Sequence, residues 1–171
     1  LFRSSRSEGE IDMALMLRQS SKPRCRERTL STLRGPPMPF IRTALPKDTN
    51  PDTVRQIVEG IHQALVDAIG IPDSELFNLI ERYEPDNFHF SRSFNSIARS
   101  DRLVVVEITM RRGRSDAMKR SLYAGIAKNL GAAGIRAQDV FIFMHENDYS
   151  DWSVGNGVFA MNIVQQPGAD G

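Results

Sequence analysis

Hydrophobic and polar positions alternate in a strand–helix–strand order near the middle of the chain. An apolar run predicts a strand over Pro39–Leu45. Apolar residues then recur at helical spacing after Asn50, a helix-capping residue type, and stop at Gly70, which is typical of a helix end. A second strand is predicted over Phe77–Tyr83, after which Glu84-Pro85-Asp86-Asn87 interrupts the regular pattern.

The same order recurs in the second half, after an irregular stretch that ends at Ser100. The pattern predicts a strand over Leu103–Met110, a helix capped by Ser115 and a strand over Val140–Met144. The two halves superpose at an offset of 64 residues, which places Asp52 on Asp116. We therefore interpret the chain as an internal duplication of one β-α-β unit.

Two such units predict an α/β fold of the α+β type. The crossovers should be right-handed, so that each unit forms a parallel strand pair and the two units form a four-stranded mixed sheet with two helices on one face. The other face then lacks a cover. We expect apolar residues to be exposed there and to be buried against other subunits of a homo-oligomer; they include Val104, Val106, Ile108, Ile142 and Met144.

Composition limits the classes of function and location. Residues 1–37 hold eight Lys or Arg and four Asp or Glu, whereas residues 38–171 hold fourteen and seventeen, so the two parts carry charges of +4 and −3. The acidic larger part argues against nucleic-acid binding. Cys25 is the single cysteine, which excludes an intrachain disulfide and agrees with a reducing cytoplasm. Neither a membrane-spanning run nor a signal-peptide core is visible.

The first 37 residues differ in character from the rest. They are rich in Arg and Ser, lack sustained periodicity and end in Gly35-Pro36-Pro37, which predicts a disordered basic extension. We expect this extension to lie upstream of the true start, for which Met38 is the natural candidate; a transit peptide is the competing interpretation. The domain proper is then residues 38–171.

Pro39 directly follows this candidate start. If Met38 is removed, Pro39 becomes a free secondary amine, which is a base or nucleophile unlike any side chain. Burial or neighbouring cations would bring the pKa of this amine toward neutrality. The alternative is a proline that merely opens an edge strand.

Charged residues near the ends of the predicted strands provide further candidates. In an extended Arg111-Arg112-Gly113-Arg114 segment, Arg112 and Arg114 would point together into one pocket while Arg111 points away. Paired guanidinium groups favour a carboxylate or phosphate ligand, although a solvated basic loop is the alternative. Glu75, in the loop before the second strand, could activate water or hold a proton, or could be a surface charge.

The segment from Glu146 to Gly157 places Trp152, the sole tryptophan, among polar residues and glycines, which suggests a pocket wall or lid. Its carboxylates lack the order of a calcium-binding loop. No spacing joins the three histidines as ligands of a metal, so we predict neither a metal nor another cofactor; these histidines, interpreted as structural, are His62, His89 and His145.

Together these features resemble the tautomerase superfamily, and within it the malonate semialdehyde decarboxylase-like branch. The resemblance rests on Met38-Pro39, on Arg112-Gly113-Arg114 before a serine and on the Glu-Asn-X-X-X-Asp-Trp-Ser-X-Gly-X-Gly pattern of residues 146–157. It implies a trimer of two-unit subunits, with an amino-terminal proline as the catalytic group.

The resemblance also implies roles for single residues. Pro39 would be the catalytic amine, Arg112 and Arg114 would grip the carboxylate of a small substrate, and Trp152 would form a pocket wall. Glu75 stands where the decarboxylases have an aspartate, and a pocket with Val154 in place of their aromatic residue would be wider. These departures leave tautomerisation of a keto acid and decarboxylation of a β-keto acid both open. A non-catalytic trimeric interaction protein is the alternative from another class.

Overall fold

The computed structural model describes residues 39–164, and the extension predicted over residues 1–37 lies outside them. Two β-α-β units follow one another, joined by an irregular segment of residues 84–103 that we call the strap. Their elements are β1 (Phe40–Pro46), α1 (Pro51–Ile69), β2 (Asn78–Tyr83), β3 (Val104–Arg111), α2 (Asp116–Ala132) and β4 (Val140–Asn147). The predicted duplication is confirmed, since every element of the first unit has a counterpart in the second.

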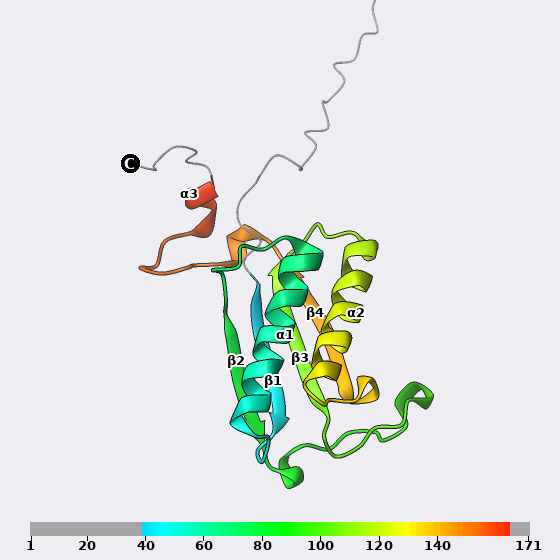
Figure 1. The fold of residues 1–171 in the computed structure, drawn as a ribbon. Helices are drawn as coiled ribbons and strands as arrows, with labels where there is room; N and C mark the ends of the chain where they lie inside the picture. The colour runs from blue at the N-terminus through cyan, green and yellow to red at the C-terminus, as the bar shows by residue number, and fades with distance from the viewer. Residues whose placement is uncertain (1–38, 165–171) are drawn as a thin grey trace, which may run out of the picture. The chain divides into compact units, whose positions relative to one another are not determined.

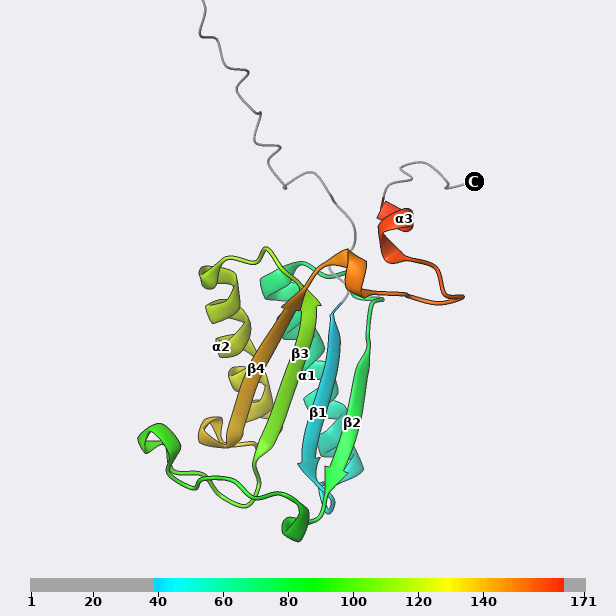
Figure 2. The same cartoon turned by 180° about the vertical axis from the view of Figure 1, so that it is seen from behind.

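The four strands form one mixed sheet in the order β2-β1-β3-β4. Each unit contributes a parallel pair, and the units are joined by the antiparallel pairing of β1 with β3, in which Ile41 lies opposite Ile108. Both helices cover the same face of the sheet (Figures 1 and 2). The predicted fold class is therefore confirmed. None of the helices within residues 39–164 combines the length and apolarity needed to cross a bilayer.

Local capping sets the bounds of both helices. The side chain of Asn50 accepts a hydrogen bond of 2.8 Å from the backbone N–H of Asp52, and Ser115 accepts one of 3.3 Å from Met118. Gly70 ends α1 with φ 75°, a left-handed conformation that glycine adopts without strain. The caps at Asn50 and Ser115 fix where the chain enters each helix, and Gly70 fixes where it leaves α1 for the loop that follows.

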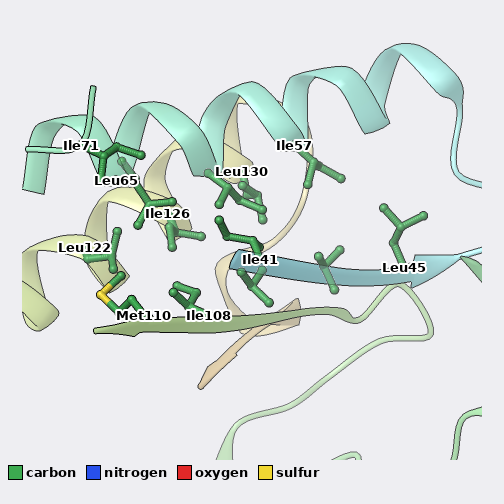
Figure 3. Packing of buried hydrophobic residues seen from close by; sticks show 14 residues of the cluster. Ile41, Leu45, Ile57, Leu65, Ile71, Ile108, Met110, Leu122, Ile126 and Leu130 are labelled. Atoms are coloured by element: carbon green, nitrogen blue, oxygen red, sulfur yellow. The ribbon is translucent and has the colours of Figure 1, made fainter. Parts of the chain in front are cut away.

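The core lies between the helices and the sheet (Figure 3). It includes Val104, Val106 and Ile108, which are almost fully buried, so the prediction that these residues lie on the uncovered face is wrong. Ile142 and Met144 also pack against this core. Alternate residues of a strand face opposite sides, and in β1 and β3 the more apolar set is the one that the helices cover.

The uncovered face carries the other set, which is more polar along β3: Val105, Glu107 and Thr109. Toward the strap this face is aromatic and forms a groove of about 590 Å³. Its lining includes Phe88, Phe90, Phe94, Phe141 and Phe143. Burial of this face against other subunits stays a prediction.

A buried carboxylate holds the end of the strap against the second unit. Asp139, whose side chain is 1% exposed, accepts hydrogen bonds of 2.6 Å from the backbone N–H of Ser100 and 2.7 Å from the Ser100 hydroxyl. The guanidinium of Arg136 lies 3.6 Å from the same carboxylate. Because all of these partners are polar, Asp139 is satisfied in the interior and fixes where β3 and β4 begin.

We predict that Asp139→Ala lowers the free energy of unfolding by about 2–4 kcal/mol, because it leaves the partly buried N–H and hydroxyl of Ser100 without their acceptor. Urea unfolding followed by circular dichroism measures this loss. Asp86→Ala, at an exposed position of the strap, is the control and should change stability by less than about 0.5 kcal/mol. Equal losses in the two variants would contradict the anchoring role.

Candidate active site

One end of the sheet gathers the residues that the sequence singles out. Because β1 and β3 are antiparallel, the start of the first unit's strands meets the end of the second unit's strands. Pro39 precedes β1 and Glu75 precedes β2, whereas Arg112 follows β3 and Trp152 follows β4. In Figure 2 this is the end of the sheet at the top, where the chain continues from β4 into the orange segment.

A pocket of about 390 Å³ opens at this end. It brings together four of the predicted site residues, which are Pro39, Glu75, Trp152 and Val154. Its other lining residues are Phe40, Phe77 and Ser153. The sequence analysis did not predict these three residues. Each lies within two positions of a predicted site residue, and this proximity is the signal that could have identified them.

Glu75 is the one ionisable side chain among the described residues that line this pocket. Its Oε2 atom is buried and has no hydrogen-bond partner within the described part of the chain. Such an oxygen keeps its full capacity to accept a proton or to bind a donor from a ligand. The backbone N–H of Glu75 donates to the carbonyl of Pro72 over 3.0 Å, which forms a turn just before the pocket.

Trp152 is held from the end of β4. After β4 the chain forms the short helix η5 (Tyr149–Asp151), whose cap Asp148 exchanges hydrogen bonds with Asp151. The indole N–H of Trp152 then donates to the side-chain oxygen of Asn147 over 2.8 Å. This bond satisfies the polar edge of the ring and leaves its apolar part for the pocket.

The arginines are placed differently from the prediction. Arg112 pairs with Asp148 at 3.0 Å, while Arg114 donates to the backbone carbonyl of Arg111 over 2.8 Å. Neither Arg112 nor Arg114 lines the pocket. The extended alternation that we assumed does not continue past β3, because the chain turns at Gly113, whose φ is 112°. Their proposed role in binding a carboxylate stays a prediction.

Arg111, which was expected to point away, lies with Arg114 around Tyr149. The guanidinium carbon of Arg111 is 4.7 Å from the centre of the Tyr149 ring, which is 4% exposed. Burial raises the pKa of the Tyr149 phenol. The pKa of Arg114 is lowered, mainly by burial and to a smaller extent by the charge of Arg111. Arg114 remains a cation at neutral pH. The guanidinium groups of Arg111 and Arg114 therefore lie near the buried Tyr149 at this end of the sheet.

Within the described residues, no three side chains of His, Cys, Asp or Glu come together in a group that could hold a metal ion. His145 lies 3.3 Å from Glu107 on the uncovered face, and His62 contacts the loop that carries Glu75. The acid–base side chain that lines the described pocket is the carboxylate of Glu75.

Two family profiles, both described as "Tautomerase enzyme", match residues 75–155 and residues 39–91. The probable tautomerase YusQ of Bacillus subtilis (strain 168) is 31% identical over 121 residues, which are 70% of this chain and 95% of that relative. The chain belongs to the tautomerase family. Tautomerase-family membership extends over both β-α-β units, since the two matched ranges together cover residues 39–155.

Solved structures agree with this assignment and with the malonate semialdehyde decarboxylase-like branch of the superfamily. The structure of FG41 malonate semialdehyde decarboxylase inhibited by 3-bromopropiolate is 28% identical, with a TM-score of 0.68; the similarity covers 74% of this chain and 95% of that one. A symmetric trimer of wild-type fused 4-OT, at 18% identity and a TM-score of 0.61, shares the fold over 71% of this tautomerase-family chain and 96% of its own chain.

We predict that Asn147→Leu shifts the fluorescence emission of Trp152, the sole tryptophan, because the indole loses the acceptor that orients it. Steady-state emission spectra of the folded proteins measure the shift. Asn162→Ala, in an exposed position of the short helix α3 (Ala160–Val164), is the control and should leave the spectrum unchanged. An unchanged spectrum in Asn147→Leu would show that the bond does not position the ring.

Proposed function

We propose that this tautomerase-family chain is an enzyme that uses the amine of an amino-terminal Pro39 on a keto-acid or β-keto-acid substrate. The observation that supports this proposal most directly is the pocket in which a buried Pro39 lies with Glu75 and Trp152. The lining is otherwise largely apolar, so a small substrate would be shielded from water and its developing charge would interact strongly with the few polar groups.

The proposal requires that Met38 is removed. A proline that follows another residue is a tertiary amide without a basic lone pair, whereas an amino-terminal proline is a secondary amine that can take up or give a proton. Burial of this amine in an apolar pocket lowers its pKa, and the neighbouring carboxylate of Glu75 raises it. The balance between the two decides whether Pro39 is a base or an acid in the free enzyme.

The first candidate reaction is keto-enol tautomerisation. Neutral Pro39 takes a proton from the carbon next to the carbonyl of a 2-keto acid. The electron pair of that C–H bond forms a C=C bond, and the π pair of the carbonyl moves to its oxygen. Protonated Pro39 then gives the proton to the enolate oxygen, which yields the enol, and the reverse sequence regenerates the ketone. No atom is lost, and Pro39 returns to its starting state.

The second candidate is decarboxylation of a β-keto acid such as malonate semialdehyde. The C–C bond to the carboxylate breaks, carbon dioxide leaves, and the electron pair forms an enolate that receives a proton on carbon from protonated Pro39. Pro39 then takes up a proton from water, which restores its starting state. The buried, unpartnered Oε2 of Glu75 favours this candidate, because a carboxylate beside the amine stabilises its protonated form. The 28% identity to a malonate semialdehyde decarboxylase agrees with it.

Arg112 and Arg114 are proposed to bind the substrate carboxylate. For this, Arg112 would exchange the carboxylate of Asp148 for that of the substrate. Both members of that pair are more than half exposed, and an exposed ion pair is worth roughly 0–1 kcal/mol, so the exchange costs little. Trp152 and Val154 would border the rest of the substrate.

We further propose that the subunit assembles as a homotrimer through the uncovered face of the sheet. Large apolar side chains are exposed on or beside this face, and exposed apolar patches commonly mark subunit interfaces. They include Leu79, Phe94 and Phe141, with exposed fractions of 48%, 54% and 38%. The trimeric state of fused 4-OT, which shares the fold, supports this proposal.

We predict that protein expressed from Met38, with Met38 removed, catalyses ketonisation of phenylpyruvate or decarboxylation of malonate semialdehyde. Pro39→Ala should lower kcat/KM about 100-fold or more, because a primary amine with a different pKa and geometry replaces the catalytic group. Steady-state kinetics with both compounds test this expectation, and mass spectrometry confirms the start at Pro39.

The full 171-residue chain is the matched control, because its Pro39 nitrogen is an amide and should be inactive. Equal activity of the full chain and the shorter protein would exclude a role for the amine. If neither protein turns over any keto acid and Pro39→Ala changes nothing, the non-catalytic interaction protein is the better account.

We also predict that Glu75→Gln shifts the pH dependence of kcat/KM. Removing the negative charge lowers the pKa of Pro39, so the limb of the profile that reports this amine moves to lower pH. If Pro39 is the base, the rate rises with pH through this limb; if it is the acid, the rate falls. Titrating both reactions in the parent enzyme and in Glu75→Gln measures the shift. An unmoved limb would contradict contact between Glu75 and Pro39.

A further inference from the structure

We infer that His62 is a positioning residue for Glu75, an inference that rests on the proposed function. His62 lies on α1, outside the pocket, and its side chain is 13% exposed. Its Nε2 atom is 2.8 Å from the backbone carbonyl oxygen of Asp73, two residues before Glu75. A carbonyl oxygen only accepts, so Nε2 carries the hydrogen and the imidazole ties the loop to the helix.

The loop from Ile71 to Phe77 is fixed at both ends. At the helix end, the N–H of Gly70 donates to the carbonyls of Leu65 and Val66 over 3.2 and 3.0 Å. At the strand end, the carbonyl of Phe77 accepts a 2.9 Å hydrogen bond from Ile41 of β1. The residues between, at positions 72–74, are exposed, so packing does little to hold them.

The bond from His62 acts on this weakly packed middle. It fixes the backbone of Asp73. The turn in which the N–H of Glu75 donates to the carbonyl of Pro72 includes Asp73, so it also fixes the backbone from which the Glu75 carboxylate extends. Helix α1 is a rigid support, because its residues Ile57, Ile61 and Leu65 are buried in the core. The place of the Glu75 carboxylate relative to Pro39 therefore depends on an imidazole that touches neither.

Packing alone does not account for a histidine at this position. Its second ring nitrogen, Nδ1, is buried and has no hydrogen-bond partner among the described residues. Burying a polar atom in this way costs free energy that an apolar side chain of similar size would avoid. The acidic side chain of Asp73 is not the main partner, since its Oδ1 atom lies 3.7 Å from Nε2 and the side chain is 89% exposed.

The test uses protein expressed from Met38, because the hydrophobic core and the residues packed against it lie within residues 41–144 and do not need the preceding segment. Phenylpyruvate and malonate semialdehyde are both assayed, and the readout is kcat of whichever reaction Glu75→Gln slows. His62→Leu and His62→Asn both remove the donor at the Nε2 position. His62→Gln restores it, because its amide nitrogen lies as many bonds from Cα as Nε2 does.

We expect His62→Leu and His62→Asn to lower kcat about 10- to 100-fold with less than about a 3-fold change in KM, since a misplacement of about 1 Å costs that much in rate. His62→Gln should stay within about 3-fold of the parent. Asp73→Asn, which keeps the backbone carbonyl, is the matched control and should stay within about 2-fold. In a Glu75→Gln background, His62→Leu should add less than about a 2-fold loss, because coupled residues are not additive.

The inference is overturned if His62→Gln is as slow as His62→Leu, if the loss is the same in the Glu75→Gln background, or if Glu75→Gln slows neither reaction. If circular dichroism shows that His62→Leu does not fold, His62→Asn takes its place. The inference is then overturned if His62→Gln is as slow as His62→Asn. A Pro39→Ala variant as active as the parent would instead overturn the proposed function, so the two failures are distinguishable.

Discussion

The antiparallel pairing of β1 with β3 is the constraint on which the site depends. Each β-α-β unit is parallel within itself, so its strands begin at one end of the sheet and finish at the other. Pairing the units head to tail places the beginnings of β1 and β2 beside the ends of β3 and β4. A duplicated sequence thereby builds a single asymmetric pocket, in which the first unit contributes Pro39 and Glu75 and the second contributes Trp152.

The same arrangement separates stability from chemistry. The helices cover the more apolar set of β1 and β3, and Asp139 holds the strap from within. None of the residues that line the described pocket belongs to the core cluster. Short polar links position its groups instead: Asn147 for Trp152 and His62 for the loop of Glu75. In the proposed mechanism, a few hydrogen bonds of this kind set the geometry on which the rate depends.

The fold could be predicted from the sequence because its signals are local and repeated. The caps at Asn50 and Ser115, the stop at Gly70 and the 64-residue offset all describe elements that the structure contains. The sequence did not predict which residues of β3 face the helices, because the long apolar run of this strand shows no clear alternation of apolar and polar residues. The position of the helices decides which of its residues are buried. The directions of the Arg112 and Arg114 side chains also depend on distant parts of the chain. Gly113 turns the backbone between them, and Asp148, which follows β4, pairs with Arg112.

The central claim, that Pro39 is a reactive amine in this pocket, is tested most directly by chemical trapping. Protein expressed from Met38 contains no cysteine, because Cys25 is the only one in the chain. Incubation with 2-oxo-3-pentynoate, an electrophilic alkyne that carries a carboxylate, should add one equivalent to the protein. Peptide mapping by mass spectrometry should locate the adduct on the nitrogen of Pro39, with loss of activity in proportion. An adduct on another residue, or equal labelling of the full 171-residue chain at its internal proline, would contradict the account.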